Sequence, residues 1–101
     1  MSLEEMENTF VAKIEGCEMP GGWHYVQVPA ELSLPLKHLA INFGFIAITA
    51  AVGNSSWPTS LLPKGDGTYF IALPAKVRAK EKLLYGDEIK MSFGPRMKQR
   101  K

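Results

Sequence analysis

The chain has 101 residues, of which 46% are hydrophobic and 22% are charged, and its formal net charge is +2. This length and composition are typical of one globular domain and exclude disorder over the whole chain. Its one cysteine, Cys17, cannot form an internal disulfide, so nothing indicates an oxidised, secreted scaffold. The N-terminus lacks the basic and apolar regions of a signal peptide, and the longest apolar stretch, residues 39–52, is too short and broken to span a bilayer. We therefore expect a cytoplasmic protein that does not contact membranes.

Charge is unevenly distributed along the chain. Residues 1–59 hold six acidic and two basic residues, a net charge of −4, whereas residues 60–101 hold ten basic and four acidic residues, a net charge of +6. A basic half can bind phosphate or acidic partners, but it is also typical of a solvated face. We expect a flexible acidic N-terminus over residues 1–8, a single β-barrel domain over 9–94, and a basic frayed tail over 95–101.

Alternating apolar residues and clusters of β-branched and aromatic residues predict a mostly β chain. Strands are expected at residues 9–15, 23–28, 45–52, 57–62, 68–73 and 89–93. Two short helices are expected: residues 30–39, which Pro35 interrupts, and residues 75–84, which Gly86 should end in a left-handed conformation.

Three segments predict how strands begin and end. Residues 53–56 are rich in Gly, Asn and Ser and predict a turn. Pro58 should confine its strand to a sheet edge or a bulge, since proline cannot donate to a ladder. Residues 64–67 predict a hairpin turn, because their glycines can take positive φ.

Residues 22–30 and 67–75 repeat one pattern of Gly, aromatic, β-branched, aliphatic, Pro and Ala residues. Each copy then runs through a predicted helix to a glycine, Gly44 or Gly86, and into another strand. Two such units, packed about a pseudo-twofold axis, would cover each other's apolar faces and close a barrel. A coincidental match stays open as an alternative, because Gly, Pro and Ala are common at turns and at the ends of elements in any chain.

Several short motifs carry a resemblance to a known family. They are Gly21–Pro29 (GGWHYVQVP), Ser56–Leu61 (SWPTSL), Gly65–Tyr69 (GDGTY), Val77-Arg78 and Gly86-Asp87. In these motifs the chain resembles the bacterial domain-of-unknown-function family numbered 1905, often found fused to a bacteriocin-protection, OmpD-associated domain. The resemblance implies a double-split β-barrel, similar to the swapped-hairpin barrels of AbrB- and MazE-like DNA-binding proteins. It implies no activity.

A ligand pocket is the first candidate site, lined by Trp23, His24, Trp57, Ser60 and Arg78. His24 could act there as an acid or base near neutral pH. The alternative is purely structural, because alternation along a strand places Trp23 and Tyr25 on the face opposite His24.

Catalytic, metal and cofactor sites are not predicted. The serines and threonine around Trp57 lack a Gly-x-Ser-x-Gly elbow. Cys17, His24 and His38 are spaced seven and fourteen residues apart, which matches no familiar ligand pattern.

A second candidate surface lies on the second helix, where Lys76, Arg78, Lys80 and Lys82 form two rows at i and i+4. These cations could contact nucleic-acid phosphates, although no aromatic residues are interleaved with them and a solvated face is the simpler explanation. We expect a non-catalytic binding or interaction module with a protein or small-molecule ligand. The alternatives are a nucleic-acid-binding protein, from the fold kinship, and an enzyme with a small pocket near His24.

Overall fold

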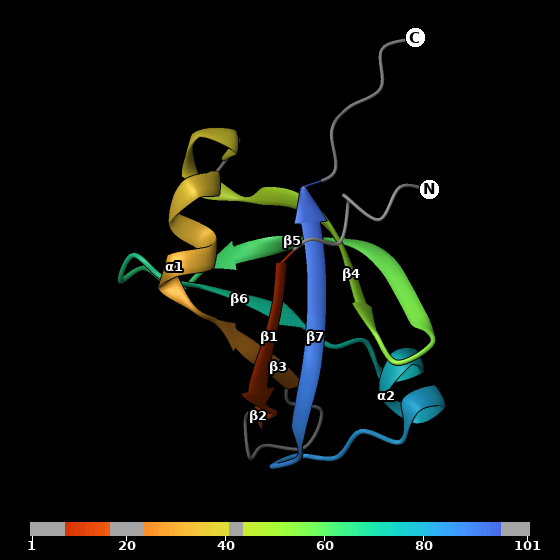
Figure 1. The fold of residues 1–101 in the computed structure, drawn as a ribbon. Helices are drawn as coiled ribbons and strands as arrows, with labels where there is room; N and C mark the ends of the chain where they lie inside the picture. Colours follow the sequence, from red (N-terminus) through yellow and green to blue (C-terminus); the bar gives the residue numbers. More distant parts are fainter. Residues whose placement is uncertain (1–7, 17–23, 41–43, 96–101) are drawn as a thin grey trace, which may run out of the picture.

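The computed structural model describes residues 8–16, 24–40 and 44–95, and within them the chain is mostly β (Figure 1). The elements run in the order β1 (Asn8–Lys13), β2 (Glu15–Gly16), β3 (His24–Val28), α1 (Ala30–Ser33), η2 (Leu34–Leu39), β4 (Ile46–Val52), β5 (Ser55–Pro63), β6 (Tyr69–Ala72), α2 (Ala75–Glu81) and β7 (Glu88–Pro95).

The strands form one antiparallel sheet that nearly closes into a barrel. Its order is β1-β7-β4-β5-β6-β3-β2, so β1 and β2 stand at its two ends. These two strands are separated in the chain only by Ile14, which is 1% exposed. The Ile14 N–H donates to the Asp87 carbonyl at 2.8 Å, and the Ile14 carbonyl accepts from the Gly86 N–H at 2.9 Å. One bent segment therefore joins both ends of the sheet, which removes most of the open edge that such a sheet would have.

The core is built from the inward faces of alternating strands. Phe10 and Ile14 are buried and Val11 is 59% exposed, so the predicted alternation of the first strand is confirmed. The ring of Phe10 meets that of Phe93 edge-on, with centroids 6.1 Å apart. The other fully buried apolar side chains are Val26, Val28, Ile46, Ile48, Ala50, Leu61, Ile71 and Met91. Burying each larger aliphatic side chain contributes about 1.5–3 kcal/mol, so this layer dominates stability.

The strand around Pro58 is longer than predicted. β5 has nine residues and includes Ser55 and Ser56, which the sequence assigned to a turn. It pairs with β4 over residues 55–61 and with β6 only through Leu62 and Pro63. At Pro58, β5 pairs with β4 on one side, and no other described strand pairs with it on the other side. Pro58 therefore faces an open side of β5, as the edge prediction requires, although it lies in the middle of a long strand.

The hairpin between β5 and β6 follows its prediction. Gly65 and Gly67 have φ of +96° and +95°, and the Lys64 N–H donates to the Thr68 carbonyl at 2.9 Å. The Asp66 carboxylate accepts from the Thr68 amide at 3.0 Å and from its hydroxyl at 2.5 Å. These bonds, with the Thr68 hydroxyl bond first, lower the pKa of Asp66 below its ordinary value.

Both helical segments begin directly after a proline, as predicted. The first changes from α to 3₁₀ form at Leu34, next to Pro35. The second, α2, ends earlier than predicted. Its left-handed residue is Lys82 (φ +58°), whose N–H donates to the Arg78 and Ala79 carbonyls. Gly86 also has positive φ (+90°) but lies in the following turn, so the expectation that it ends the helix is wrong.

Residues 1–7 of the N-terminus, the basic tail beyond Pro95, Cys17 and Trp23 lie outside the described residues. No helix within residues 8–16, 24–40 and 44–95 is long and apolar enough to cross a membrane. In the view of Figure 1, α1 and α2 lie at opposite sides of the sheet, and the β4–β5 hairpin reaches toward α2.

Candidate functional site

The second helix holds the candidate site, and two contacts fix its position. Val77 is buried and packs α2 against the barrel. At the last residue of the helix, the Glu81 carboxylate accepts hydrogen bonds from the Ser55 hydroxyl at 2.6 Å and the Asn54 amide at 3.2 Å. Both donors belong to the start of β5 or the turn before it, so Glu81 ties α2 to the β4–β5 hairpin.

The turn after α2 presents two large apolar side chains to solvent. Leu84 is 68% exposed and Tyr85 is 62% exposed. The backbone around them is nevertheless held. The Leu84 N–H donates to the Asp87 carboxylate and its carbonyl accepts from the Asp87 N–H, both at 2.9 Å. The bonds of Gly86 and Asp87 to Ile14 tie the same turn to the closing segment of the barrel. Exposed apolar side chains on a fixed turn mark a candidate interaction surface.

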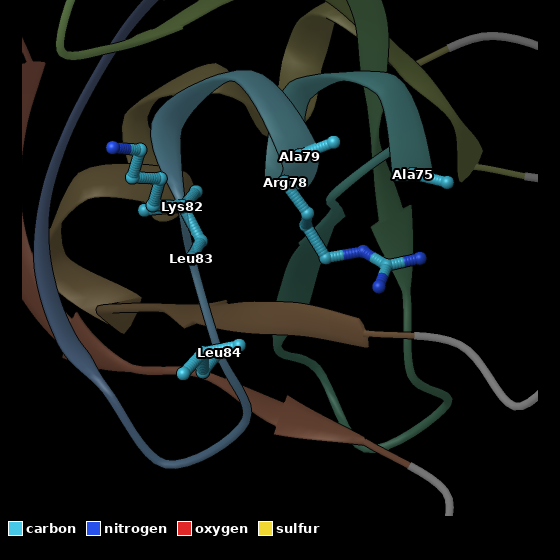
Figure 2. Close-up of a pocket in the computed structure, with 6 residues that line it drawn as sticks. All are labelled: Ala75, Arg78, Ala79, Lys82, Leu83 and Leu84. Atoms are coloured by element: carbon cyan, nitrogen blue, oxygen red, sulfur yellow. The ribbon is translucent and has the colours of Figure 1, made fainter.

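A shallow pocket of about 410 Å³ lies between α2 and this turn (Figure 2). Its lining residues are Ala75, Arg78, Ala79, Lys82, Leu83 and Leu84. Figure 2 shows the side chains of Arg78 and Lys82 extending to different sides, with Leu83 beside Lys82 and Leu84 below both. The pocket therefore combines an apolar floor with a cation at each flank.

Arg78 is oriented by the protein itself. Its Nε–H donates to the Leu73 carbonyl at 3.0 Å, and the Leu73 N–H donates to the His24 carbonyl at 2.9 Å. This chain of bonds connects the arginine to the start of β3. Within the described part of the chain no carboxylate pairs with Arg78 or Lys82.

His24 lies near this site but forms no acid–base pair with the described residues. Its Nδ1 atom is buried without a hydrogen-bond partner there, and its ring meets the Tyr85 ring edge-on with centroids 6.4 Å apart. The backbone bonds through Leu73 place His24 and Arg78 in one region.

Trp57 and Ser60 lie elsewhere on β5 and face opposite ways. Trp57 stands opposite the buried Ala50 and packs against the core, and its Nε1 atom is buried with no acceptor among the described residues. Ser60 pairs with Ala47 on the other face of the strand. Of the five residues predicted to line a pocket, Arg78 lines the pocket on α2 and His24 lies close to it.

The predicted basic row is distributed around α2. Lys76, Lys80 and Lys82 are exposed, whereas Arg78 is half-buried. Leu84, which the sequence placed at the end of the second helix, lies outside α2 on the surface. The left-handed Lys82 redirects the chain before Leu84, and no pattern in the sequence signals a left-handed lysine.

These features define a small, mostly β barrel protein with a shallow amphipathic pocket on one helix. The chain belongs to the family described as Domain of unknown function (DUF1905), whose model matches residues 10–93. The resemblance found in the sequence motifs is therefore confirmed at the level of the family. A search of the curated proteins finds no match. Because the family description names no activity, the function must be argued from the geometry.

Proposed function

We propose that this protein is a non-catalytic binding module whose ligand site is the pocket between α2 and the turn that follows it. The observation that carries this proposal is the combination of a fixed apolar surface with two available cations. Exposed Leu84 and Tyr85 stand on a turn whose backbone is bonded at both ends. A ligand that covers them would gain about 25 cal/mol per Å² of apolar area removed from water.

We also propose that the barrel is double-split and consists of two pseudo-symmetric units, β3-α1-η2-β4 and β6-α2-β7. The sheet order supports this arrangement, because each strand of one unit pairs with its counterpart in the other, β3 with β6 and β4 with β7. In the β3–β6 pair, Val26 stands opposite Ile71, which is its counterpart in the repeat. When one unit is superposed on the other, Tyr25 maps onto Phe70 and Ala72 onto Gln27, so the pair Tyr25–Ala72 maps onto the pair Gln27–Phe70.

The pairing of β4 with β7 supports the same twofold relation. When Gly44 and Gly86 are taken as counterparts, Ala50 corresponds to Ser92 and Ala51 to Phe93. The observed pairs are Ala50–Phe93 and Ala51–Ser92, so they also exchange with each other. A chance repeat of Gly, Pro and Ala would not require counterpart strands to be neighbours in the sheet, as β3 and β6, and also β4 and β7, are.

The pocket uses a position at which the two units differ. Arg78 is the fourth residue of α2, and the fourth residue of α1 is Ser33, which is fully buried and bonds its own helix through the Ala30 carbonyl. The pocket therefore lies at a position where the two units are not equivalent.

A fragment screen by two-dimensional NMR tests this proposal. The ¹⁵N-labelled protein is titrated with neutral, cationic and anionic fragments, and we expect hits that shift the amides of Leu83 and Leu84. Leu84→Asp should abolish these shifts, whereas Leu34→Asp, at a 54% exposed position on η2, should preserve them. If no fragment of any class shifts these amides, or if Leu84→Asp binds normally, the proposed site is wrong.

Nucleic-acid binding is a second candidate, favoured by the exposure of Lys76, Lys80 and Lys82 around one helix. It predicts retardation of random duplex DNA at low salt, which should weaken steeply as salt is added. Replacing all three lysines with glutamate should abolish the retardation. A wild-type protein that leaves DNA unretarded at low salt would exclude this function.

A further inference from the structure

We propose that the ligand of this pocket is an amphipathic carboxylate, that is, a carboxylate group joined to an apolar body. This inference rests on the proposed binding function and specifies the chemistry of its ligand. The carboxylate would bind the guanidinium of Arg78, and the apolar body would cover Leu83 and Leu84.

The Arg78 guanidinium is prepared for a planar anion. Its Nε–H is already engaged by the Leu73 carbonyl at 3.0 Å, which fixes the plane of the group. The terminal Nη groups, which receive no acceptor from the described residues, form a fork of two parallel donors. Such a fork matches the two oxygens of a carboxylate, and little side-chain freedom is lost on binding because the plane is held beforehand.

The floor of the pocket requires an apolar partner beside that anion. Ala75, Ala79, Leu83 and Leu84 supply most of the lining, and Leu84 is largely exposed without a ligand. A polyanion such as a phosphate chain would leave these side chains uncovered, whereas a neutral apolar ligand would leave two cations unused. A carboxylate with an apolar body satisfies both parts of the lining.

The backbone conformation of Lys82 is a second observation that supports a role for its charge. Among the described residues it is the only one other than glycine with positive φ, a conformation that disfavours a β-carbon. Glycine would relieve that strain, and the pocket would lose a flanking cation. Because Figure 2 shows Lys82 and Arg78 on different sides of the pocket, we assign the direct contact to Arg78 and a long-range attraction to Lys82.

The test compares octanoate with octanamide on the wild-type protein, following the Leu83 and Leu84 amides by NMR at pH 7.5 and low salt. The two probes share their apolar chain and differ in charge. We expect octanoate to bind at least tenfold more tightly than octanamide. Equal binding of the two probes, or tighter binding of octyl phosphate than of octanoate, would overturn the carboxylate assignment. A tetrapeptide that ends in leucine is also titrated, once with a free C-terminal carboxylate and once with an amidated C-terminus. If the free form binds more tightly than both the amidated form and octanoate, the carboxylate is that of a peptide; if octanoate binds more tightly than the peptide, it is that of a small free acid.

Variants separate the contributions of the two cations. Arg78→Lys keeps the charge but loses the fork, and we expect octanoate binding to weaken about tenfold. Lys82→Gly should weaken it severalfold, whereas Lys80→Ala, which removes the same charge from α2 outside the pocket lining, should leave it unchanged. Equal weakening by Lys82→Gly and Lys80→Ala would exclude a specific role for Lys82. If neutral or cationic fragments bind at the pocket and octanoate does not, the binding function stands and the carboxylate assignment falls.

Discussion

The contact between Gly53 and Glu81 makes the sharpest prediction about how α2 is held. Gly53 has a φ of +57°, and a β-carbon placed there would overlap the Glu81 carboxylate, with the Cδ atom at 2.9 Å. That carboxylate also accepts the hydrogen bonds from Ser55 and Asn54. The β-carbon meets Oε1 and Cδ, whereas both hydrogen bonds end on Oε2, so a side chain at position 53 must shift the carboxylate and should weaken both bonds.

The structure gives a magnitude for each substitution. Removing the charge-assisted bond to the part-buried Ser55 and the exposed bond to Asn54 should make Glu81→Ala cost about 2 kcal/mol of unfolding free energy. Gly53→Ala should cost about 1–2 kcal/mol for the left-handed backbone and, because it also displaces Glu81, about 3–4 kcal/mol in total. In the Glu81→Ala background only the backbone cost remains, so the double variant should be about 2 kcal/mol more stable than the sum of the single changes predicts.

Urea denaturation followed by tryptophan fluorescence measures this double-mutant cycle. Gly65→Ala is the matched control, because Gly65 also has positive φ (+96°) but a β-carbon added there would meet no atom within 4 Å. Its cost should be the same with and without Glu81. If Gly53→Ala costs the same in both backgrounds to within about 0.5 kcal/mol, the proposed coupling is refuted.

Three further predictions follow from single contacts. Lys82→Gly should raise the unfolding free energy by about 1 kcal/mol in urea denaturation, since it relieves a left-handed lysine; a loss of stability would contradict this. The pKa of Asp66, followed by carbon NMR, should lie below 3.8 and should rise toward 3.8 in Thr68→Val. Because folding lowers this pKa, the ionised Asp66 slightly stabilises the protein above pH 3.8, and this stabilisation is lost as the pH falls through the lowered pKa. Phe10→Ala should cost about 3–5 kcal/mol by thermal or urea unfolding, whereas Val11→Ala should cost less than about 0.5 kcal/mol, and similar costs would mean that the face of β1 is misassigned.

Local patterns in the sequence were sufficient for much of the fold. The alternation that buries Phe10 and Ile14 follows from the two-residue period of a strand. Pro29 and Pro74 end strands and start helices because proline lacks the ladder donor and fits a helix start. Gly65 and Gly67 take positive φ because no β-carbon opposes it. Each of these outcomes depends on a residue and its near neighbours, so the sequence predicts it.

Partners that are distant in the chain determined the rest. Pro58 lies inside the nine-residue β5 because β4 pairs with one side of that strand and leaves the proline's other side without a described strand. Lys82 took the left-handed position that Gly86 was expected to hold, which shortened α2 and brought Leu84 to the surface. Trp57, predicted to line a pocket, is partly buried and packs against the core.

The sequence by itself determined a mostly β chain of this family, with its hairpin turns and two short helices. Only the tertiary structure decided that β1 and β2 close the sheet through Ile14, and that α2 and the turn after it form an amphipathic pocket. The physical reason is that bonds between residues far apart in the chain close the sheet and hold α2 and the turn after it in place. Ile14 bonds Gly86 and Asp87, and Glu81 bonds Ser55. No local propensity at either end of such a bond specifies its partner.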